Sequence, residues 1–378
     1  MGNMRRAVHL TTVHHPHDPR IYYKQCMSLA KANYEVILIA QKADAENAAP
    51  ASNPIEHIPL KTYGSRWKRM IFGTWDAYRK ARKQNADIYV FHDPELLFVG
   101  ALLKKRNNIV IYDIHEDYVT SILQKKYLPT FLRKGIAKGY TILEKYLTRK
   151  MELSLAEKYY KDIYKRGTCV LNYPLLDEKL VNKRNEQPTS NEVLYTGNVT
   201  YDRGALIHAR LPQIDPQVSV QFIGKCAKSL AEKMYETAGE KKDQLRIKGI
   251  DQFILKADIE AMYKSKNWLA GIALFPPTEH YMKKELTKFF EYMNAGLPII
   301  CSDFPVWKQF IETHQCGIAV DPYNETEIKA ALETLRNNPE LAKQMGENGQ
   351  KAVQKELNWQ AEERKLLGWY NELVEGMC

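Results

Sequence analysis

Short apolar segments recur along this chain and alternate with longer segments that have helical periodicity. Segments of this kind are typical of strands that are buried on both faces. Parallel strands need a crossover between them, usually a helix, so the alternation predicts α/β domains with parallel, doubly wound sheets. The strands expected in the first half of the chain are 7–13, 35–40, 55–60, 88–91, 109–114 and 169–171.

The alternation starts again after a polar stretch, which predicts a second domain of the same class. With 378 residues the chain is too long for one ordinary domain and suits two. We expect an amino-terminal domain over 1–176, a linker over 177–191 that lacks an apolar period, and a carboxy-terminal domain over 192–355. The last segment, 356–378, is expected to be an amphipathic helix that returns to the first domain. The strands expected in the second domain are 193–195, 218–223, 245–248, 271–275, 299–301 and 318–320, with helices between them.

The composition limits the binding partners and the cellular compartment that we expect for this protein. The net charge of +10 favours an anionic partner, which could be a membrane surface, nucleic acid or an anionic substrate. No nucleic-acid-binding motif accompanies the charge, so we do not expect nucleic acid. The six cysteines are scattered without a CxxC pair, and no apolar run is long enough to span a bilayer. We therefore expect a cytoplasmic protein, and the oligomeric state stays open.

Two basic stretches suggest a membrane-facing surface. Residues 66–83 form an expected helix that mixes Arg and Lys with Trp, Ile and Phe, and residues 131–165 are expected to be a long, basic helical region. Such helices bind the surface of an anionic bilayer, at the inner face of the membrane. The alternative is an ordinary helix with a solvated charged face.

The stretch 283–303 predicts a loop, a short helix and a buried strand. Thr287 is the expected N-cap, and Gly296 suits the left-handed residue that ends a helix. Lys283, Lys284 and Lys288 crowd the helix start, where the macrodipole is already positive, and this favours a bound anion. The alternative is again a solvated polar face.

Two further features lie near this helix start. Glu291 comes one residue too late for a capping box with Thr287, so its carboxylate is free for another contact. After the strand 193–195, a glycine turn from Thr196 to Gly204 carries Arg203, whose guanidinium could hold a phosphate. The alternative is an ordinary surface turn.

Polar side chains also follow three strands of the first domain. Because ligands bind beyond the carboxyl ends of strands in open α/β sheets, these side chains are expected to share one edge. A single His at a strand end is more often structural, but three strand ends carrying His favour a site. A metal has little support, because no HExxH or Cys/His cluster is present, so none is expected. The residues are His14, His15, His17, Asp18, Arg20, His92, Asp93, Glu95, His115, Glu116 and Asp117.

Together these motifs resemble a known family. The tandem α/β domains, the GNVTYDRG turn, the HDPELL motif, the LTKFFEYMNAGLPIICSD stretch and the NWQAEE segment are similar to the GT-B glycosyltransferases, and within them to the retaining family 4. The resemblance covers nearly the whole chain. It implies two Rossmann-like domains that face each other across a cleft, and transfer of a sugar from a nucleotide-diphosphate donor with retained anomeric configuration. It implies no cofactor and no metal, with a UDP-sugar favoured over a GDP-sugar.

The resemblance also implies roles for single residues. Glu291 matches the second glutamate of the family's E-x7-E motif, which binds the donor ribose, and Arg203 matches the basic residue that contacts the diphosphate. Lys288 and the Thr287 amide sit where the family cradles phosphates, in company with Gly197 and Asn198. His92 matches the histidine beside the transferred sugar, so His92, Arg203 and Lys288 are the expected catalytic residues. The residues expected near the acceptor or sugar are His17, Asp18, Arg20, His115, Glu116 and Lys283.

Two positions depart from the family pattern. Lys283 stands where the first glutamate of E-x7-E is expected, and Asn198 stands where an Arg is frequent. Because of the first departure, the family's usual contact to the donor sugar is expected to be missing or replaced. Because of the second, Arg203 and Lys288 are expected to neutralise more of the diphosphate charge. The expected acceptor is a lipid-linked or cell-surface glycan. The alternative is a non-catalytic, nucleotide-binding subunit of an envelope glycan assembly complex, while an NAD-dependent enzyme lacks its dinucleotide fingerprint.

Overall fold

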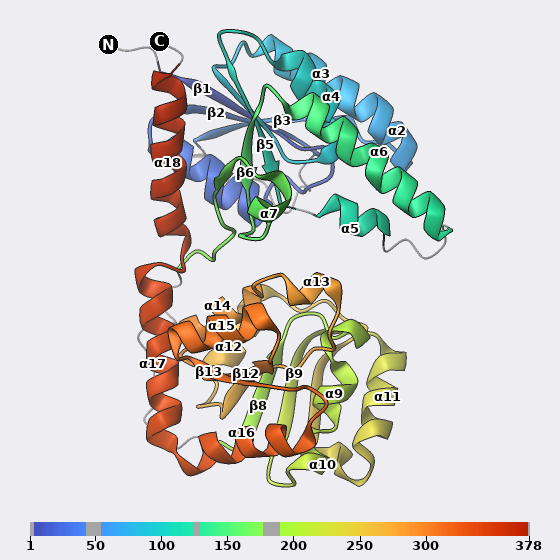
Figure 1. Cartoon of the computed structure of the whole chain (residues 1–378), viewed down its shortest axis with the longest axis vertical. Helices are drawn as coiled ribbons and strands as arrows, with labels where there is room; N and C mark the ends of the chain where they lie inside the picture. The colour runs from blue at the N-terminus through green and yellow to red at the C-terminus, as the bar shows by residue number, and fades with distance from the viewer. Residues whose placement is uncertain (1–3, 43–53, 116, 124–128, 177–189, 377–378) are drawn as a thin grey trace. The chain divides into compact units, whose positions relative to one another are not determined.

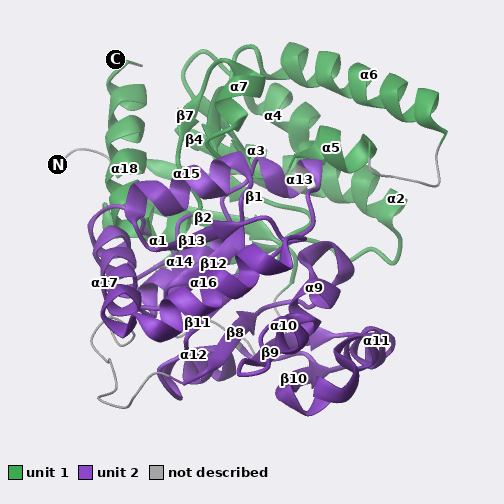
Figure 2. Cartoon of the chain, turned by 60° about the horizontal axis from the view of Figure 1, so that its bottom comes forward, with its two compact units in different colours: residues 1–172, 359–378 green, residues 173–358 purple. Residues whose placement is uncertain are grey.

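The computed structural model describes residues 4–42, 54–115, 117–123, 129–176 and 190–376. The chain divides into two compact units, the first comprising residues 1–172 and 359–378 and the second residues 173–358 (Figures 1 and 2). Most of the expected linker, 177–189, lies outside the described residues. Within the described part of the chain, no helix has both the length and the apolar character needed to cross a bilayer.

Unit 1 contains a seven-stranded parallel sheet in the order β3-β2-β1-β4-β5-β6-β7. The first strand, β1, is paired on both sides, with Val8 opposite Ile37 of β2 and Tyr89 of β4. The strand order therefore reverses at β1, and such a switch point is where open α/β sheets bind ligands. The strands are β1 Arg6–Leu10, β2 Glu35–Ala40, β3 Ile55–Pro59, β4 Ile88–Phe91, β5 Ile109–Ile114, β6 Glu152–Leu155 and β7 Thr168–Cys169.

The prediction of one long helical region over 131–165 was wrong. Helix α6 ends at Thr148, and β6 (Glu152–Leu155) then pairs in parallel with β5. The sequence of β6 is ELSL, in which Glu and Leu are good helix formers, so the local propensity hides the strand. The edge of β5 supplies hydrogen bonds that decide the conformation, which is a tertiary effect.

Alternate residues of the unit 1 strands point to two separate cores, as the period of two in a strand requires. One core contains Val8, Leu10 and Phe91 and lies under α3, α4 and α6. The other contains Ala7, Val36 and Leu38 and lies under η1, α1 and α18. The helices of unit 1 are η1 Pro19–Cys26, α1 Met27–Lys31, α2 Arg66–Lys68, η3 Arg69–Gly73, α3 Thr74–Lys83, η4 Pro94–Leu96, α4 Leu97–Leu103, α5 Tyr118–Leu123, α6 Thr130–Thr148, α7 Tyr160–Tyr164 and α18 Trp359–Glu375.

Helix α18, at the end of the chain, belongs to unit 1. Trp359, Leu366 and Tyr370 are buried in the second core. Two polar contacts fix the helix: the Trp359 indole donates to Ser28 Oγ at 2.9 Å, and Glu362 Oε2 accepts from the Leu171 amide at 2.9 Å. Helix α18 thus covers part of one face of the first sheet.

Unit 2 contains a six-stranded parallel sheet in the order β10-β9-β8-β11-β12-β13, whose strand order reverses at β8. Its strands are β8 Glu192–Thr196, β9 Ser219–Cys226, β10 Leu245–Ile250, β11 Ala270–Ala273, β12 Ile299–Ser302 and β13 Gly317–Val320. Its helices are η5 Tyr201–Arg203, α9 Ala205–Ala209, α10 Leu211–Ile214, α11 Lys228–Ala238, η6 Gly239–Gln244, α12 Lys256–Lys264, α13 Glu279–Met282, α14 Thr287–Asn294, α15 Pro305–His314, α16 Glu325–Asn337 and α17 Pro339–Lys355.

The stretch 283–303 forms the loop, helix and strand that its sequence predicts, with one correction. Thr287 is the first residue of α14 and not its N-cap, because Leu286 has the extended backbone of the cap position. Among the described residues no side chain caps this helix, so its start keeps the polarity of open backbone amides. Gly296 ends the helix with φ of 70°, as expected.

Candidate functional site

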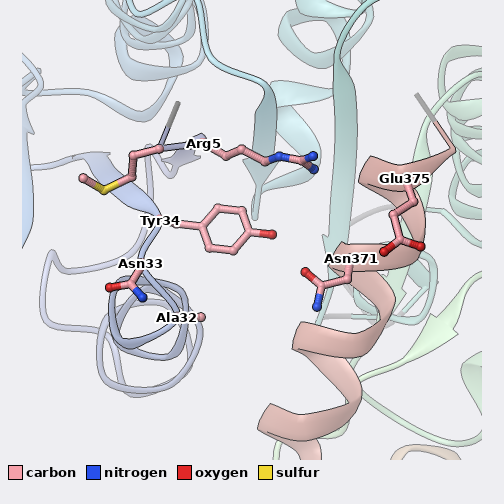
Figure 3. Close-up of a pocket in the computed structure, with 7 residues that line it drawn as sticks. Arg5, Ala32, Asn33, Tyr34, Asn371 and Glu375 are labelled. Atoms are coloured by element: carbon pink, nitrogen blue, oxygen red, sulfur yellow. The ribbon is translucent and has the colours of Figure 1, made fainter. Parts of the chain in front are cut away.

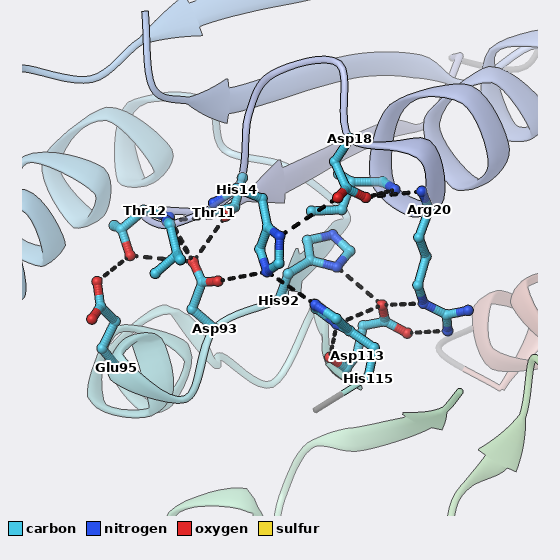
Figure 4. Close-up of polar contacts among 12 residues, drawn as sticks. Thr11, Thr12, His14, Asp18, Arg20, His92, Asp93, Glu95, Asp113 and His115 are labelled. Carbon is cyan, nitrogen blue, oxygen red and sulfur yellow. Dashed lines mark hydrogen bonds and ion pairs between the residues drawn. The ribbon is translucent and has the colours of Figure 1, made fainter. Parts of the chain in front are cut away.

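Asp113 is the centre of a polar cluster at the carboxyl ends of β1, β4 and β5 in unit 1 (Figure 4). Arg20 from η1 donates to both of its carboxylate oxygens, at 2.9 and 2.7 Å, and His92 Nδ1 lies 3.0 Å from Oδ2. Burial would raise the pKa of Asp113, but the Arg20 charge and the hydrogen bonds from His115, His92 and Arg20 hold it well below its usual value. Asp113 is therefore a buried carboxylate that orients the residues around it.

His92 is linked to a second buried histidine. Its Nε2 shares a hydrogen bond of 3.0 Å with His9 Nδ1, and the two rings stack with centroids 5.3 Å apart. Burial lowers the pKa of both imidazoles, although Asp113 opposes the effect. Two neutral rings thus lie next to the carboxylate, and one proton is shared along the His9–His92 contact.

His14 and His115 form the more exposed side of the same cluster. Their Nε2 atoms lie 3.0 Å apart, and His14 also lies 3.4 Å from Asp93 Oδ1 and 3.5 Å from Asp18 Oδ2. Asp18 caps η1 by accepting from the Arg20 and Ile21 amides. Burial would raise the pKa of Asp18, but hydrogen bonds from His14 and these amides outweigh burial and lower the pKa to about 2.

Other residues expected near an acceptor or sugar are placed differently. Arg20 is buried, and its guanidinium is held by Asp113 and the Val170 carbonyl, so it positions Asp113. His17 packs its ring edge-on against Tyr22, with centroids 4.9 Å apart. Glu116 lies outside the described residues.

His92, Asp113 and His115 also offer three ligand atoms within 4.8 Å of one another, a spacing that a metal ion could use. The carboxylate of this group already faces the Arg20 guanidinium at 2.7 Å. A divalent ion here would have to share Asp113 with that fixed positive charge, which disfavours it electrostatically.

Lys288 is the central residue of a second cluster, at the carboxyl end of β8 in unit 2. It stands in the first turn of α14, and its side chain is buried with 8% of its surface exposed. Nζ donates to the Thr196 carbonyl at 2.9 Å and lies 3.4 Å from the centroid of the Tyr195 ring. Burial, and then the charge of Arg203, lower its pKa well below the usual value, while Glu291 opposes the shift.

Arg203 is held in place by a tyrosine. Its Nε donates to the Tyr281 hydroxyl at 3.1 Å, and that hydroxyl donates to Asp202 Oδ2 at 3.0 Å. Gly204, with φ of 75°, follows directly, and a Cβ there would lie 1.9 Å from the Leu274 carbonyl oxygen. Only glycine allows this turn to lie so close to the end of β11, which keeps Arg203 near Lys288.

Glu291 completes the cluster. Its Oε2 accepts from the Tyr263 hydroxyl at 3.2 Å, and Tyr263 in turn lies 2.9 Å from Thr196 Oγ1. Gly197 follows Thr196 with φ of 85°, and Asn198 is exposed, its carbonyl accepting from the Tyr195 hydroxyl at 2.9 Å.

Two further predicted residues of unit 2 lie around the start of α14. Thr287 is exposed in the first turn, and Lys283 is exposed and paired with Glu279 at 3.2 Å. The structure thus brings Arg203, Lys288 and Glu291 together at one sheet edge, whereas Lys283 has a carboxylate partner on its own short helix.

Several residues of these clusters were not predicted from the sequence. Asp113 had a detectable signal, because a carboxylate inside the apolar segment IVIYDI has to be paired when buried. The roles of Tyr263 and Tyr281 depend on α12 and α13 packing near β8, and no local pattern indicates that.

A cavity of about 490 Å³ lies elsewhere in unit 1 (Figure 3). It is lined by Arg5, Tyr34, Asn371 and Glu375 among others, and Arg5 precedes β1. The cavity is therefore at the amino end of β1, opposite to the edge that carries Asp113 and His92. In open α/β sheets ligands bind at the carboxyl edge, which favours the two clusters over this cavity.

Comparison with known proteins gives information on the family and the fold. Residues 177–352 match the family model of glycosyl transferases group 1, which covers most of unit 2. No curated protein matches the sequence. Sucrose-phosphate synthase from Thermosynechococcus elongatus has a similar structure, with a TM-score of 0.71 and 16% identity over 99% of this chain and 100% of that chain.

Two further solved structures are similar over nearly their whole length. A glycosyltransferase from Rickettsia africae ESF-5 gives a TM-score of 0.71 at 13% identity, over 98% of this chain and 99% of that one. Anabaena HepE in complex with UDP and glucose gives a TM-score of 0.66 at 12% identity, over 97% of this chain and 99% of that chain. These likenesses show that the chain has the GT-B fold of two Rossmann-like domains, and the match of residues 177–352 to the glycosyl transferases group 1 model identifies it as a transferase.

Proposed function

We propose that this protein is a retaining glycosyltransferase of family 4 that moves a sugar from a nucleotide-diphosphate sugar to a lipid-linked or cell-surface glycan. The observation that carries the proposal is the pair of cations Arg203 and Lys288 beside the uncapped start of α14. A UDP-sugar is favoured over a GDP-sugar, since the similar HepE protein has been solved with UDP and with UDP-glucose.

The electrostatics of this cluster suit a diphosphate. Lys288 is buried next to the charge of Arg203, and its own hydrogen bond goes to a neutral carbonyl. An anion bound at this point would relieve the repulsion between the two cations, and the first-turn amides of α14 would add donors. As the sugar leaves, negative charge grows on the diphosphate, and each such group typically stabilises the transition state by about 3–4 kcal/mol.

The other residues have roles that follow from their positions. We propose that Glu291, which accepts a hydrogen bond from Tyr263, also accepts from ribose hydroxyls of the nucleotide. In unit 1, His92 is oriented by Asp113 at the carboxyl edge where the sugar or acceptor would bind. We propose that the protein's own cations replace a metal, so that no cofactor is needed and turnover resists EDTA.

We place the reaction in the cytoplasm, at the inner face of the cell membrane. A lipid-linked acceptor would be reached there, and the basic helices of unit 1 support contact with an anionic membrane surface. Lys283 stands where the resemblance expects a glutamate that contacts the donor sugar, so we propose that this contact is missing or replaced here.

The test is release of nucleotide diphosphate from a panel of UDP- and GDP-sugars, with and without lipid-linked glycan acceptors. We expect acceptor-dependent release from a UDP-sugar, and NMR of the product should show the donor's anomeric configuration. Arg203→Ala should lower kcat/KM about 100- to 1000-fold. The matched control is Arg246→Ala. Arg246 is an exposed arginine near the start of β10, the outermost strand of the sheet, and it pairs with Glu192 at the amino end of β8.

Two outcomes would contradict the proposal. Full turnover by Arg203→Ala would show that the pair of cations is not needed for sugar transfer. UDP binding without turnover on any donor would instead favour the non-catalytic, nucleotide-binding subunit.

A further inference from the structure

The outer side of one helical layer in unit 1 exposes an unusual number of large apolar side chains. Helices α3, α4 and α6 pack through their inner sides on the same core and lie side by side in Figure 1. Their outer sides, together with α2 and η3, are here called the helical surface. Its exposed apolar residues are Trp67 (75%), Ile71, Phe72, Trp75, Phe98 (58%), Leu102 (59%), Phe131 (77%), Ile136, Ile142 and Tyr146.

The helical surface carries a net positive charge. In the described residues of these five helices the carboxylates are Asp76, which is paired with Lys80 at 2.8 Å, and Glu144, which is buried. Exposed cations are interleaved with these apolar side chains along the sequence of α2, α3 and α6. These cations are Arg66, Lys68, Arg79, Arg82, Lys83, Lys134, Lys138 and Lys145.

A shallow hollow of about 500 Å³ on α3 combines both features. Trp75 and Tyr78 line it with their rings 5.3 Å apart, and Arg79, Arg82 and Lys83 surround them. Guanidinium groups bind phosphate oxygens in a bidentate manner, and indole rings prefer the boundary between water and hydrocarbon. The hollow therefore has the chemistry for a phosphate headgroup next to a lipid surface.

We propose that the helical surface docks on an anionic lipid bilayer, with its Trp and Phe side chains at the headgroup level and the α3 hollow on a lipid phosphate. The inference deepens the proposed function, because it names the surface that would bring a lipid-linked acceptor within reach. The interleaving of cations and apolar side chains selects a bilayer over a protein partner. Protein interfaces have cores depleted of charge, whereas Lys and Arg at a bilayer extend their ammonium and guanidinium groups to the headgroups.

The experiment is co-sedimentation of the full chain with vesicles of phosphatidylcholine alone and of phosphatidylcholine with phosphatidylglycerol. We expect binding to the anionic vesicles, weaker binding as salt is raised, and little binding to the neutral ones. Two variants separate the components: a charge variant with Arg79→Gln, Arg82→Gln and Lys83→Gln, and an apolar variant with Trp67→Ser, Ile71→Ser and Trp75→Ser. Each should lower the partition coefficient at least tenfold.

The matched control removes the same charge elsewhere, with Lys228→Gln, Lys351→Gln and Lys355→Gln on exposed positions of unit 2. It should bind the anionic vesicles as the parent protein does. Circular dichroism melting of all variants tests that they fold. Equal loss in the control, or equal binding of the parent to neutral vesicles at high salt, would overturn the proposal.

Two further outcomes are distinguishable. Self-association that both surface variants abolish, without vesicle binding, would make the helical surface a protein interface and would also overturn the proposal. Donor turnover in solution is read separately: it can persist in a protein that does not bind vesicles, and vesicle binding can persist if the donor chemistry fails.

Discussion

The ammonium of Lys288 lies over the face of the Tyr195 ring, 3.4 Å from its centroid. A buried lysine is costly unless it is paired with a carboxylate, and here its close contacts are this ring and the Thr196 carbonyl. The nearby charges are those of Arg203, which is repulsive, and Glu291. The protein thus keeps a strained positive charge at a helix start, which is reasonable for a site that receives an anion.

Replacing Lys288 by Met should separate function from stability. The variant keeps much of the side-chain volume but loses the buried charge, so the thermal midpoint should stay unchanged or rise. Affinity for UDP should fall at least tenfold, because the diphosphate loses its partner. Calorimetric titration with UDP and thermal melting of the same samples check both parts. A large loss of stability with unchanged UDP affinity would show that Lys288 is structural.

UDP binding should be coupled to proton uptake. In the free protein burial and Arg203 lower the pKa of Lys288, so part of the population is neutral at a pH below the usual value of the lysine group. A bound diphosphate raises that pKa, and affinity should therefore fall as pH rises above the free-state pKa. The stability of the ligand-free protein depends on pH in the opposite direction. The lysine of the unfolded chain has a pKa of about 10.4, so the unfolded chain binds more protons than the folded protein at pH values between the folded-state pKa and this value. The contribution of Lys288 to the free energy of unfolding therefore rises with pH over that interval. Titrations in buffers of different ionisation enthalpy measure the uptake, which Lys288→Met should abolish.

Tyr281 should act on catalysis through Arg203. Tyr281→Phe removes the hydroxyl oxygen that accepts a hydrogen bond from Arg203 Nε, so the guanidinium loses this orienting contact. We expect kcat/KM for the donor to fall about tenfold, which is about 1.4 kcal/mol. A double-mutant cycle decides the mechanism: in an Arg203→Ala background, Tyr281→Phe should have almost no further effect. Additive losses would mean that Tyr281 acts independently of Arg203.

Asp113 should be a major determinant of the stability of unit 1. Asp113→Asn leaves the Arg20 guanidinium buried without a counter-charge, which typically costs about 3–5 kcal/mol. Ser154→Ala is the control, because it removes one hydrogen bond to Asp113 Oδ1 and should cost about 1 kcal/mol. Denaturant unfolding followed by circular dichroism measures both, and similar losses would contradict the assignment.

The same carboxylate gives a signature in acid. The pKa of Asp113 is lower in the folded protein than in the unfolded chain. The contribution of its ionised carboxylate to the free energy of unfolding is therefore complete above about pH 3.9, and it is lost as the pH falls through the folded-state pKa. Unfolding free energies measured from neutral pH into acid should fall less steeply in Asp113→Asn than in the parent protein.

The sequence predicts those features that depend on local pattern. The bounds of β2, β4 and β5 coincide with the expected strands, because their apolar residues are buried on both faces. The sequence also predicts that Arg203 and Lys288 lie at the same sheet edge, because the carboxyl ends of parallel strands meet there, and the structure has them close together. The features missed depend on tertiary contacts: β6 takes its conformation from β5, and Tyr281 reaches Arg203 only after α13 has packed.

The position of α18 has a consequence for biosynthesis. The sheet face that carries Val36 and Leu38 is covered in part by Trp359, Leu366 and Tyr370, which the ribosome adds more than three hundred residues later. The domain that begins first is therefore completed last, after the whole of unit 2 has been translated. Until then its uncovered aliphatic side chains need shielding, and a nascent chain halted before residue 359 should be a substrate for chaperones or proteases.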